Sequence, residues 1–469
     1  MTQAYVLSFT EGISVDHPAP DRVVIETSDS RFTLKNLSPG LAGAIKILSS
    51  RGATENELAV QVEEKDGVDV LSSLYYHLAI FAGRRMLRYG ILCDGRRLAT
   101  LSPVSPHFQF TPGPFDPQKS FALSRFAYLH REDGRLALES PLSHGKITLH
   151  DWRGAALIGE LAEARDLPSL CELFQELPPE AVELFLGMLL GAGFLCEAKV
   201  EDPGPGESRP LLQWDFHDLL FHARSRLGRH SNRLGGTYRF HGKIDPLPAV
   251  KPPMSEKVID LFKPDIEKLE EGDYPFTLVL EYRRSIREYA DRPITDRQLG
   301  EFLYRAARVK EMISSEIQDV SRRPYPGGGA IYELELYPTI HSCENIPPGF
   351  YHYCPKNHRL EVICGCNEAT DALLQDAIRS TGREGTPQVL ITITARFQRL
   401  SWKYESMAYS VILKNVGVLY QTMYLVATAM DLAPCALGGG DSDLFARAAG
   451  LDYYAETSVG EFLLGSKRI

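Results

Sequence analysis

The sequence lacks the patterns that mark several specialised classes of protein. Its eight cysteines are scattered and form no CxxC pair, which predicts free thiols rather than a zinc site or a disulfide framework. The first residues contain no positive stretch followed by an apolar one, so we expect a cytoplasmic protein. No long basic run occurs and the formal net charge is −10, which argues against nucleic acid as a partner.

Common motifs for nucleotides and metals are also missing. There is no GxGxxG after a strand and no GxxxxGK[ST], so neither a Rossmann nor a P-loop nucleotide site is indicated. Four histidines fall within residues 214–242, but His217 and His222 are five positions apart rather than four. Since no carboxylate spacing completes a ligand set, no metal is predicted.

The first half of the chain contains two similar stretches, each with strand-like segments followed by helix-like ones. They lie at 23–35, 41–48 and 70–87, and then at 136–150, 155–162 and 179–195. A spacing of roughly 110 residues predicts two winged-helix-like α+β modules, residues 1–100 and 101–205. The alternative is that any two α+β modules of this size look alike. An exposed strand beside a helix can accept an extended peptide, so these modules predict a peptide clamp.

The second half follows a stretch rich in proline and glycine at 201–212, which predicts a boundary. Residues 206–270 are expected to form a docking segment that carries Arg224, Arg226, Arg229 and Arg233 and continues into an extended proline-rich connector at 245–256. Residues 271–469 are expected to form an α+β layer around one sheet, with 388–394 as its buried central strand.

Two segments have the composition of a site for a flat, phosphorylated ligand. Residues 280–289 place three arginines and a serine within one short turn, and forked guanidinium donors match phosphate oxygens. A solvated basic helix end that pairs with Glu281 and Glu288 is the alternative. The loop 324–329 has three successive glycines, so its backbone could approach a flat ligand closely, although a plain turn would have the same composition.

A long helix is expected from Ser406 to about Met430, because apolar residues surround its axis. It would span roughly 35–40 Å, and a shared subunit interface would explain that length. A membrane span is the alternative, but Lys414, Asn415 and Gln421 fall near its centre, where polar and charged groups are costly. We therefore expect a partner subunit rather than a bilayer.

The dipeptide Lys403-Tyr404 is a candidate for proton transfer. If Ser401 caps the long helix, both residues lie in its first turn, where the positive end of the helix dipole favours their deprotonated forms. A general base needs that form. The alternative is an interfacial lysine beside a half-buried tyrosine.

Four motifs resemble those of a known family. RRSIREY, RPYPGGGAIYELELY, the helix from SWKY to QT, and APCALGGGD are similar to the successive motifs of the flavin nitroreductase fold. Within that fold the chain resembles the azoline dehydrogenases of ribosomal-peptide biosynthesis, and most of all the thiazoline oxidases of cyanobactin pathways, in which tandem peptide-clamp domains precede the flavin domain. The resemblance is strong from about Trp214 onward and weaker before it.

The resemblance implies an FMN site and a role for each of its residues. The FMN phosphate and ribityl chain would be held by Arg283, Ser285 and Arg287, with Arg284 in the same turn but pointing away, and closed in by Lys467 and Arg468. One face of the isoalloxazine would lie on Pro326, Gly327 and Gly328, and its N5 edge on Gly438 and Gly439. Relatives often have serine at the position of Gly327, and histidine and asparagine at those of Val418 and Thr422, so flavin contacts at Gly327 could differ here.

The resemblance also implies the reaction. Lys403 and Tyr404 match the pair to which azoline dehydrogenase catalysis is attributed. Either one would take the proton from the azoline ring, a hydride would pass to flavin N5, and dioxygen would reoxidise the flavin. We expect a homodimer through the flavin domain that acts on an azoline-containing precursor peptide. The alternatives are a general FMN reductase of nitroaromatics or quinones, and a non-catalytic peptide-binding scaffold.

Overall fold

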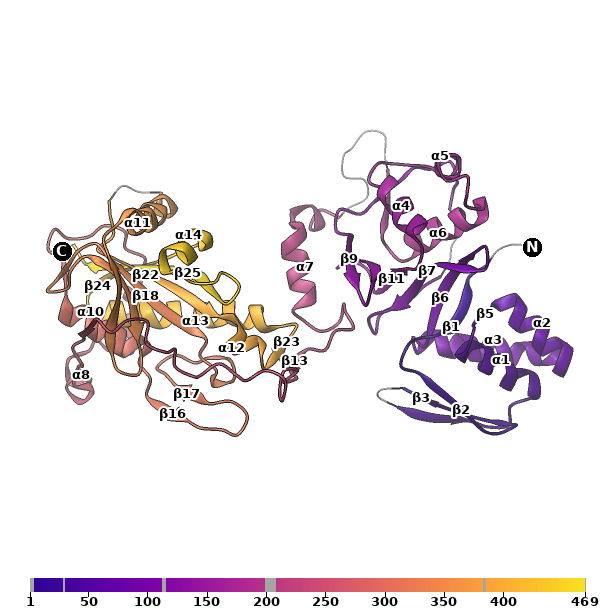
Figure 1. Cartoon of the computed structure of the whole chain (residues 1–469), viewed down its shortest axis with the longest axis horizontal. Coiled ribbons are helices and arrows are strands. Elements are labelled where there is room, and N and C mark those ends of the chain that lie inside the picture. The colour runs from indigo at the N-terminus through magenta and orange to yellow at the C-terminus, as the bar shows by residue number, and fades with distance from the viewer. Residues whose placement is uncertain (1–3, 28–29, 112–114, 199–207, 383–384, 469) are drawn as a thin grey trace. The chain divides into compact units, whose positions relative to one another are not determined.

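A computed structural model of the chain describes residues 4–27, 30–111, 115–198, 208–382 and 385–468. Two compact units are present, Met1–Asn232 and Arg233–Ile469 (Figure 1). The expected boundary at 201–212 lies largely outside the described residues. Within the described ranges, no helix combines the length and apolar character needed to cross a bilayer.

The first unit is α+β, as predicted. Its strands are β1 (Val6–Phe9), β2 (Ser14–Ala19), β3 (Arg22–Glu26), β4 (Arg31–Leu34), β5 (Ala53–Thr54), β6 (Leu87–Cys93), β7 (Arg96–Pro103), β8 (Phe121–Leu123), β9 (Tyr128–Glu132), β10 (Arg135–Glu139), β11 (Gly145–Leu149) and β12 (Leu195–Glu197). Its α-helices are α1 (Pro39–Ser49), α2 (Glu55–Asp66), α3 (Leu71–Gly83), α4 (Trp152–Glu160), α5 (Leu167–Leu173), α6 (Pro179–Gly191) and α7 (Phe216–Arg224).

The strands and helices expected in the two similar stretches are present. Strands β3 and β4 precede α1 and α3, and strands β10 and β11 precede α4 and α6. The helix α2 was not predicted. It begins with a capping box: the Thr54 hydroxyl accepts a hydrogen bond from the Glu57 backbone N–H, and the Glu57 carboxylate accepts one from the Thr54 backbone N–H. The pattern T-x-x-E at 54–57 is a local signal for this helix start.

The two predicted modules share one sheet. Its strand order is β5-β1-β6-β7-β11-β10-β9, and the expected boundary at residue 100 falls inside β7, where Thr100 pairs with Gly90 on one side and Thr148 on the other. Each half nevertheless has its own hydrophobic core, one that contains Phe81 and one that contains Phe185. The division into residues 1–100 and 101–205 therefore remains a proposal about domains.

The second unit is built on another antiparallel sheet. Its strands are β13 (Gly235–Gly236), β14 (Val258–Asp260), β15 (Ile294–Thr295), β16 (Glu311–Ile313), β17 (Val320–Arg322), β18 (Leu334–Ile340), β19 (Cys343–Glu344), β20 (Gly349–Cys354), β21 (Arg359–Gly365), β22 (Val389–Arg396), β23 (Tyr404–Glu405), β24 (Leu432–Leu437) and β25 (Glu456–Ser466). Its α-helices are α8 (Ile266–Gly272), α9 (Phe276–Tyr282), α10 (Asp296–Ala307), α11 (Glu368–Thr381), α12 (Phe397–Ser401), α13 (Ala408–Ala429) and α14 (Ser442–Ala449).

Helices cover both faces of this sheet. The strand order is β14-β21-β20-β18-β22-β25-β24, so β22 is a buried inner strand as predicted. Successive residues of β18 point to opposite faces: Leu336 packs in the core with α10 and α13, and Tyr337 packs in the core with α11 and α14. Figure 1 shows α11 and α14 together on one side of the sheet. The helix α13 therefore lies in the layer on the other side.

The prediction of one helix from the SWKY motif onward is wrong at its start. The short helix α12 ends at Ser401, β23 follows, and α13 begins only at Ala408. The backbone pairs with Gly235–Gly236 at β23 and then turns through Ser406, which has a left-handed φ of 60°. A partner strand about 170 residues away in the chain supplies these hydrogen bonds, so local periodicity could not reveal the break.

Burial of α13 is also one-sided within a single chain. Its buried residues include Val411, Asn415 and Leu419, on one face. Tyr409 and Leu413 are 48% and 40% exposed. The expectation of a helix buried on most sides is therefore not met by one subunit alone.

The segment expected to be an extended connector, residues 245–256, is extended but is docked on the sheet. The Arg396 guanidinium donates to the Pro248 carbonyl at 2.9 Å, and the Met254 backbone N–H donates to the Glu361 carboxylate at 2.9 Å. The Lys251 ammonium donates to the Tyr337 hydroxyl at 2.6 Å. The segment is therefore an integral part of the second unit.

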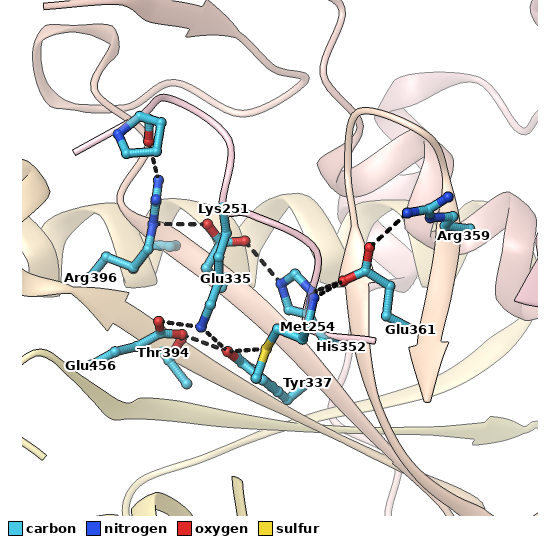
Figure 2. Close-up of polar contacts among 12 residues, drawn as sticks. Lys251, Met254, Glu335, Tyr337, His352, Arg359, Glu361, Thr394, Arg396 and Glu456 are labelled. Carbon is cyan, nitrogen blue, oxygen red and sulfur yellow. Dashed lines mark hydrogen bonds and ion pairs between the residues drawn. The ribbon is translucent and has the colours of Figure 1, made fainter. Parts of the chain in front are cut away.

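Beneath this segment lies a buried network of charged side chains (Figure 2). His352 lies between two carboxylates, with its Nδ1 3.0 Å from Glu361 and its Nε2 3.3 Å from Glu335. The other oxygen of Glu335 is 3.0 Å from Arg396 Nε. Burial raises the pKa of Glu335, but Arg396 and His352 oppose it and bring the pKa down to about 2.

This lowered pKa predicts acid sensitivity. A carboxyl whose pKa falls from its ordinary value of 4.5 to about 2 on folding stabilises the protein above pH 4.5. That contribution is lost as the pH falls from 4.5 to about 2. Glu335→Gln should therefore cost about 3 kcal/mol at pH 7 and flatten the pH dependence in this window, as measured by urea unfolding. Glu311→Gln, which removes an exposed pair with Arg322, is the control. Equal pH dependence in Glu335→Gln and the wild type would contradict the assignment.

Candidate active site

Lys403 and Tyr404 lie in the connection between α12 and α13. Ser401 is the last residue of α12 rather than the cap of a long helix, so the argument from the helix dipole does not apply to them. The Tyr404 backbone is held by its pairing with Gly236. The Lys403 ammonium lies 5.6 Å from the centre of the Tyr238 ring and 5.3 Å from that of Tyr404. Both side chains are half-buried.

The glycine loop contacts this pair directly. Gly329 has a φ of 62°, and a Cβ placed on it would lie 2.5 Å from the Tyr404 hydroxyl and 2.7 Å from the Lys403 ammonium. A side chain at this position would therefore displace the ends of both side chains from the positions that they occupy here. The structure thus brings together two motifs that are separated by about 75 residues in the sequence.

A buried pair of side chains holds the same loop from beneath. The Gly328 N–H donates to Asn415 Oδ1 at 3.1 Å, and Asn415 Nδ2 donates to Glu333 Oε1 at 2.8 Å. Glu333 is fully buried, and that burial raises its pKa. From the sequence, Asn415 was used only as evidence against a membrane span, and Glu333 was not singled out. Their polarity within apolar stretches was the available signal.

The arginine cluster follows α9 in an extended segment. The Ser285 hydroxyl is 2.7 Å from the Tyr424 hydroxyl, and the Arg283 guanidinium lies 5.3 Å from the centre of the Tyr424 ring. Arg284 is exposed and lines a hollow of about 290 Å³ together with Lys467. Arg287 and Arg468, the other two arginines predicted for the phosphate site, are both exposed.

An acidic residue also lies in this hollow. The Asp431 carboxylate is 2.9 Å from the Lys467 ammonium and accepts a hydrogen bond from the Tyr274 hydroxyl at 3.0 Å. Lys467 lowers the pKa of Asp431, so the carboxylate is ionised at neutral pH. An anion that binds here must compete with this carboxylate for the lysine.

Gly438 and Gly439 lie in the exposed loop after β24. They border a hollow of about 440 Å³ whose other side is formed by α13, including Leu413 and Gly417. Open space surrounds a Cβ built at either glycine. Glu461 also lines this hollow, and burial raises its pKa to about 7.

Within one chain, the Lys-Tyr pair and the arginine cluster are far apart. A Cβ on Gly328 would lie 2.5 Å from Val411, near the start of α13, whereas Ser285 contacts Tyr424, near its end. Thirteen residues of helix separate these two contacts by about 20 Å. The Lys-Tyr pair with its glycine loop and the arginine cluster therefore lie at opposite ends of α13.

Comparisons with known proteins give matches along most of the chain. The family models that match are "ThcOx helix turn helix domain" at residues 1–112, "Cyanobactin oxidase ThcOx" at 121–231 and "Nitroreductase family" at 280–465. MJ1384 of Methanocaldococcus jannaschii, named as a nitroreductase, is 30% identical over 37% of this chain and 81% of its own length.

Two further similarities involve microcin proteins of Escherichia coli. The microcin B17-processing protein McbC is 31% identical over 28% of this chain and 49% of its own length, so the chain spans about half of that relative. A solved structure, the microcin synthetase McbBCD complex with truncated pro-MccB17 bound, matches at 21% identity and a TM-score of 0.34, over 47% of this chain and 79% of the matched one.

Proposed function

Because the chain belongs to the nitroreductase family and its nitroreductase domain follows two segments that match cyanobactin oxidase models, we propose that it oxidises thiazolines or oxazolines of a precursor peptide to the aromatic azoles. The observation that carries this proposal is the contact of Lys403 and Tyr404 with the glycine loop at Gly329. Aromatisation of an azoline requires a base that removes a proton and a flat cofactor that accepts a hydride. The Lys-Tyr pair would supply the base, and the glycine loop beside it can approach a flat ring system.

The cofactor we propose is FMN, and the residues present fit it. Arg283 and Arg287 offer forked donors and Ser285 a hydroxyl for the phosphate, and Lys467, which lines a hollow with the neighbouring Arg284, adds a third cation. The open space at Gly438 would let the backbone approach the ring system. When bound, FMN would supply the hydride acceptor, and dioxygen would be the final acceptor.

The chain's own residues would position the azoline and move one proton. Tyr404 Oη or Lys403 Nζ would take the proton from the ring carbon between the imine nitrogen and the carbonyl. That carbon is acidic because both neighbours withdraw electrons, and aromatisation favours the product. Since both side chains are half-buried and Gly236 and Gly329 flank them, the substrate ring would replace water around the base.

We further propose that the enzyme is a homodimer through the flavin domain. Tyr409, Leu413 and Gly417 recur every four residues on the exposed face of α13, as expected for a helix that packs against a copy of itself. If the two-fold axis passes near Gly417, the start of one α13 lies beside the end of the other. The arginine cluster of one subunit would then approach the glycine loop of its partner.

The first unit has an exposed strand that could bind the peptide substrate. Its strands β2, β3 and β4 form a separate three-stranded sheet, and β2 is mostly exposed along its length. An exposed edge strand of this kind can pair with an extended peptide. We propose that the first unit binds the precursor peptide and so delivers its azolines to the second unit.

The test uses the purified full chain. We expect flavin absorption bands at close to one FMN per subunit, and hydrogen peroxide release on mixing with a thiazoline peptide. NADPH consumption with a quinone, without oxidation of the peptide, would indicate a general reductase instead. A colourless protein that binds the peptide would indicate a scaffold. Either of these results would refute the proposal.

A further inference from the structure

The largest fully buried side chain among the described residues is Arg399, in α12. Its guanidinium donates to three backbone carbonyls on three different segments: to Ile331 at 3.1 Å, to Leu247 at 2.6 Å, and to Asp319. Burial, together with neighbouring arginines, lowers the pKa of Arg399 to about 10, so it is still cationic at neutral pH.

Arg399 is a buried cation whose hydrogen bonds among the described residues go to backbone carbonyls, while the carboxylates of Asp319 and Glu333 partly offset the cost of burying its charge. Burying a charge is unfavourable unless its donors are all bonded, and an apolar side chain would pack a core at lower cost. The five donors of a guanidinium have a rigid planar arrangement, so they fix the relative positions of the carbonyls that they bind. This arrangement points to a requirement for geometry rather than for stability.

One of these bonds joins the two parts of the proposed site. Arg399 lies four residues before Lys403, and Ile331 lies two residues after Gly329, which touches Lys403 and Tyr404. The bond from Arg399 to Ile331 is therefore a short tie between the connection that bears the proton-transfer pair and the exit of the glycine loop.

The backbone at the exit of the glycine loop is strained. Ala330 and Tyr332, on either side of Ile331, have left-handed φ values of 58° and 51°. Residues with a Cβ adopt this conformation only where the surrounding structure imposes it. Arg399 holds the carbonyl between them, and the Tyr332 hydroxyl donates to the Tyr325 carbonyl at 2.8 Å.

From these contacts we propose that Arg399 is a positioning residue, which keeps Lys403 and Tyr404 in register with the glycine loop. It does not touch the substrate. The inference rests on the proposed function for its catalytic consequence, but the structural coupling between the loop and the connection stands without it.

The test compares Arg399→Met with Arg399→Lys and with a control, Arg305→Met. Arg305 is also a largely buried arginine of the second unit, but its partners are Asp273 and Glu301. In Arg399→Met we expect kcat per bound flavin to fall about 100-fold with KM unchanged, because the base is displaced rather than removed. Arg399→Lys should be intermediate, since an ammonium lacks the fork. Arg305→Met should lower only the melting temperature.

Amide hydrogen exchange gives a second measurement that needs no substrate. Arg399→Met should exchange faster in peptides that cover residues 326–332 and 400–406, and the control should not. Wild-type kcat per flavin in Arg399→Met, or exchange unchanged in both peptides, would overturn the proposal. If Arg399→Met does not fold, the same criteria apply to Arg399→Lys. If the wild type has no azoline turnover, the proposed function fails, and exchange still decides whether Arg399 couples the two segments.

Discussion

Lys403→Ala and Tyr404→Phe are each expected to lower azoline turnover by about 100- to 10,000-fold if the replaced group is the base. Both variants should fold and bind flavin, because Tyr404→Phe keeps the ring that packs against the core and the backbone pairing of Tyr404 with Gly236 does not depend on either side chain. The measurement is peroxide release per bound flavin with a thiazoline peptide. Comparison of the two variants shows which residue is the base, because the residue that only orients the substrate should show the smaller loss of turnover.

Tyr238→Phe is the matched control for these variants. Its ring lies beside the Lys403 ammonium, and the substitution keeps the ring while removing a hydroxyl close to the same site. We expect turnover within about twofold of the wild type, since the interaction of a cation with a ring does not need the hydroxyl. Wild-type turnover in Lys403→Ala or in Tyr404→Phe would remove that residue from the role of base.

Gly417→Glu is expected to abolish dimerisation and flavin binding together. A Cβ built at Gly417 meets nothing within 4 Å in the single chain, so the substitution leaves the fold of one subunit undisturbed. In the proposed dimer Gly417 lies where two α13 helices cross. Two buried carboxylates would face each other there, and unpaired buried charges of like sign oppose association.

The measurements are sedimentation velocity for the oligomeric state and absorption for bound flavin. Gly159→Glu is the control, because Gly159 is also an exposed helical glycine with open space around its Cβ, but it lies in the first unit. The control should stay dimeric and yellow. A monomeric Gly417→Glu protein that binds FMN as tightly as the wild type would contradict a site shared between subunits.

The features read correctly from the sequence are those that depend on local pattern. The inner strand β22 was expected from a continuous apolar run, and the structure has it. The same applies to the paired strands and helices of the first unit. These elements are specified by hydrophobic periodicity within about 20 residues, which a single sequence displays.

The candidate site was identified only in part. The residues of the Lys-Tyr pair and of the glycine loop were singled out from sequence, and the structure brings them into contact. Asn415, Glu333 and Arg399 were not assigned to the site, because a polar residue inside an apolar stretch has no visible partner in the sequence. Their partners are 68 to 152 residues away.

The family resemblance, the α+β class and the identity of the candidate proton-transfer pair could all be read from residue types at short spacings in the sequence. Three features became visible only in the folded chain: the pair lies outside the long helix, the proline-rich segment is docked on the sheet, and the two halves of the candidate site are at opposite ends of α13. Each of these depends on hydrogen bonds or packing between segments far apart in the chain, which local propensity does not encode.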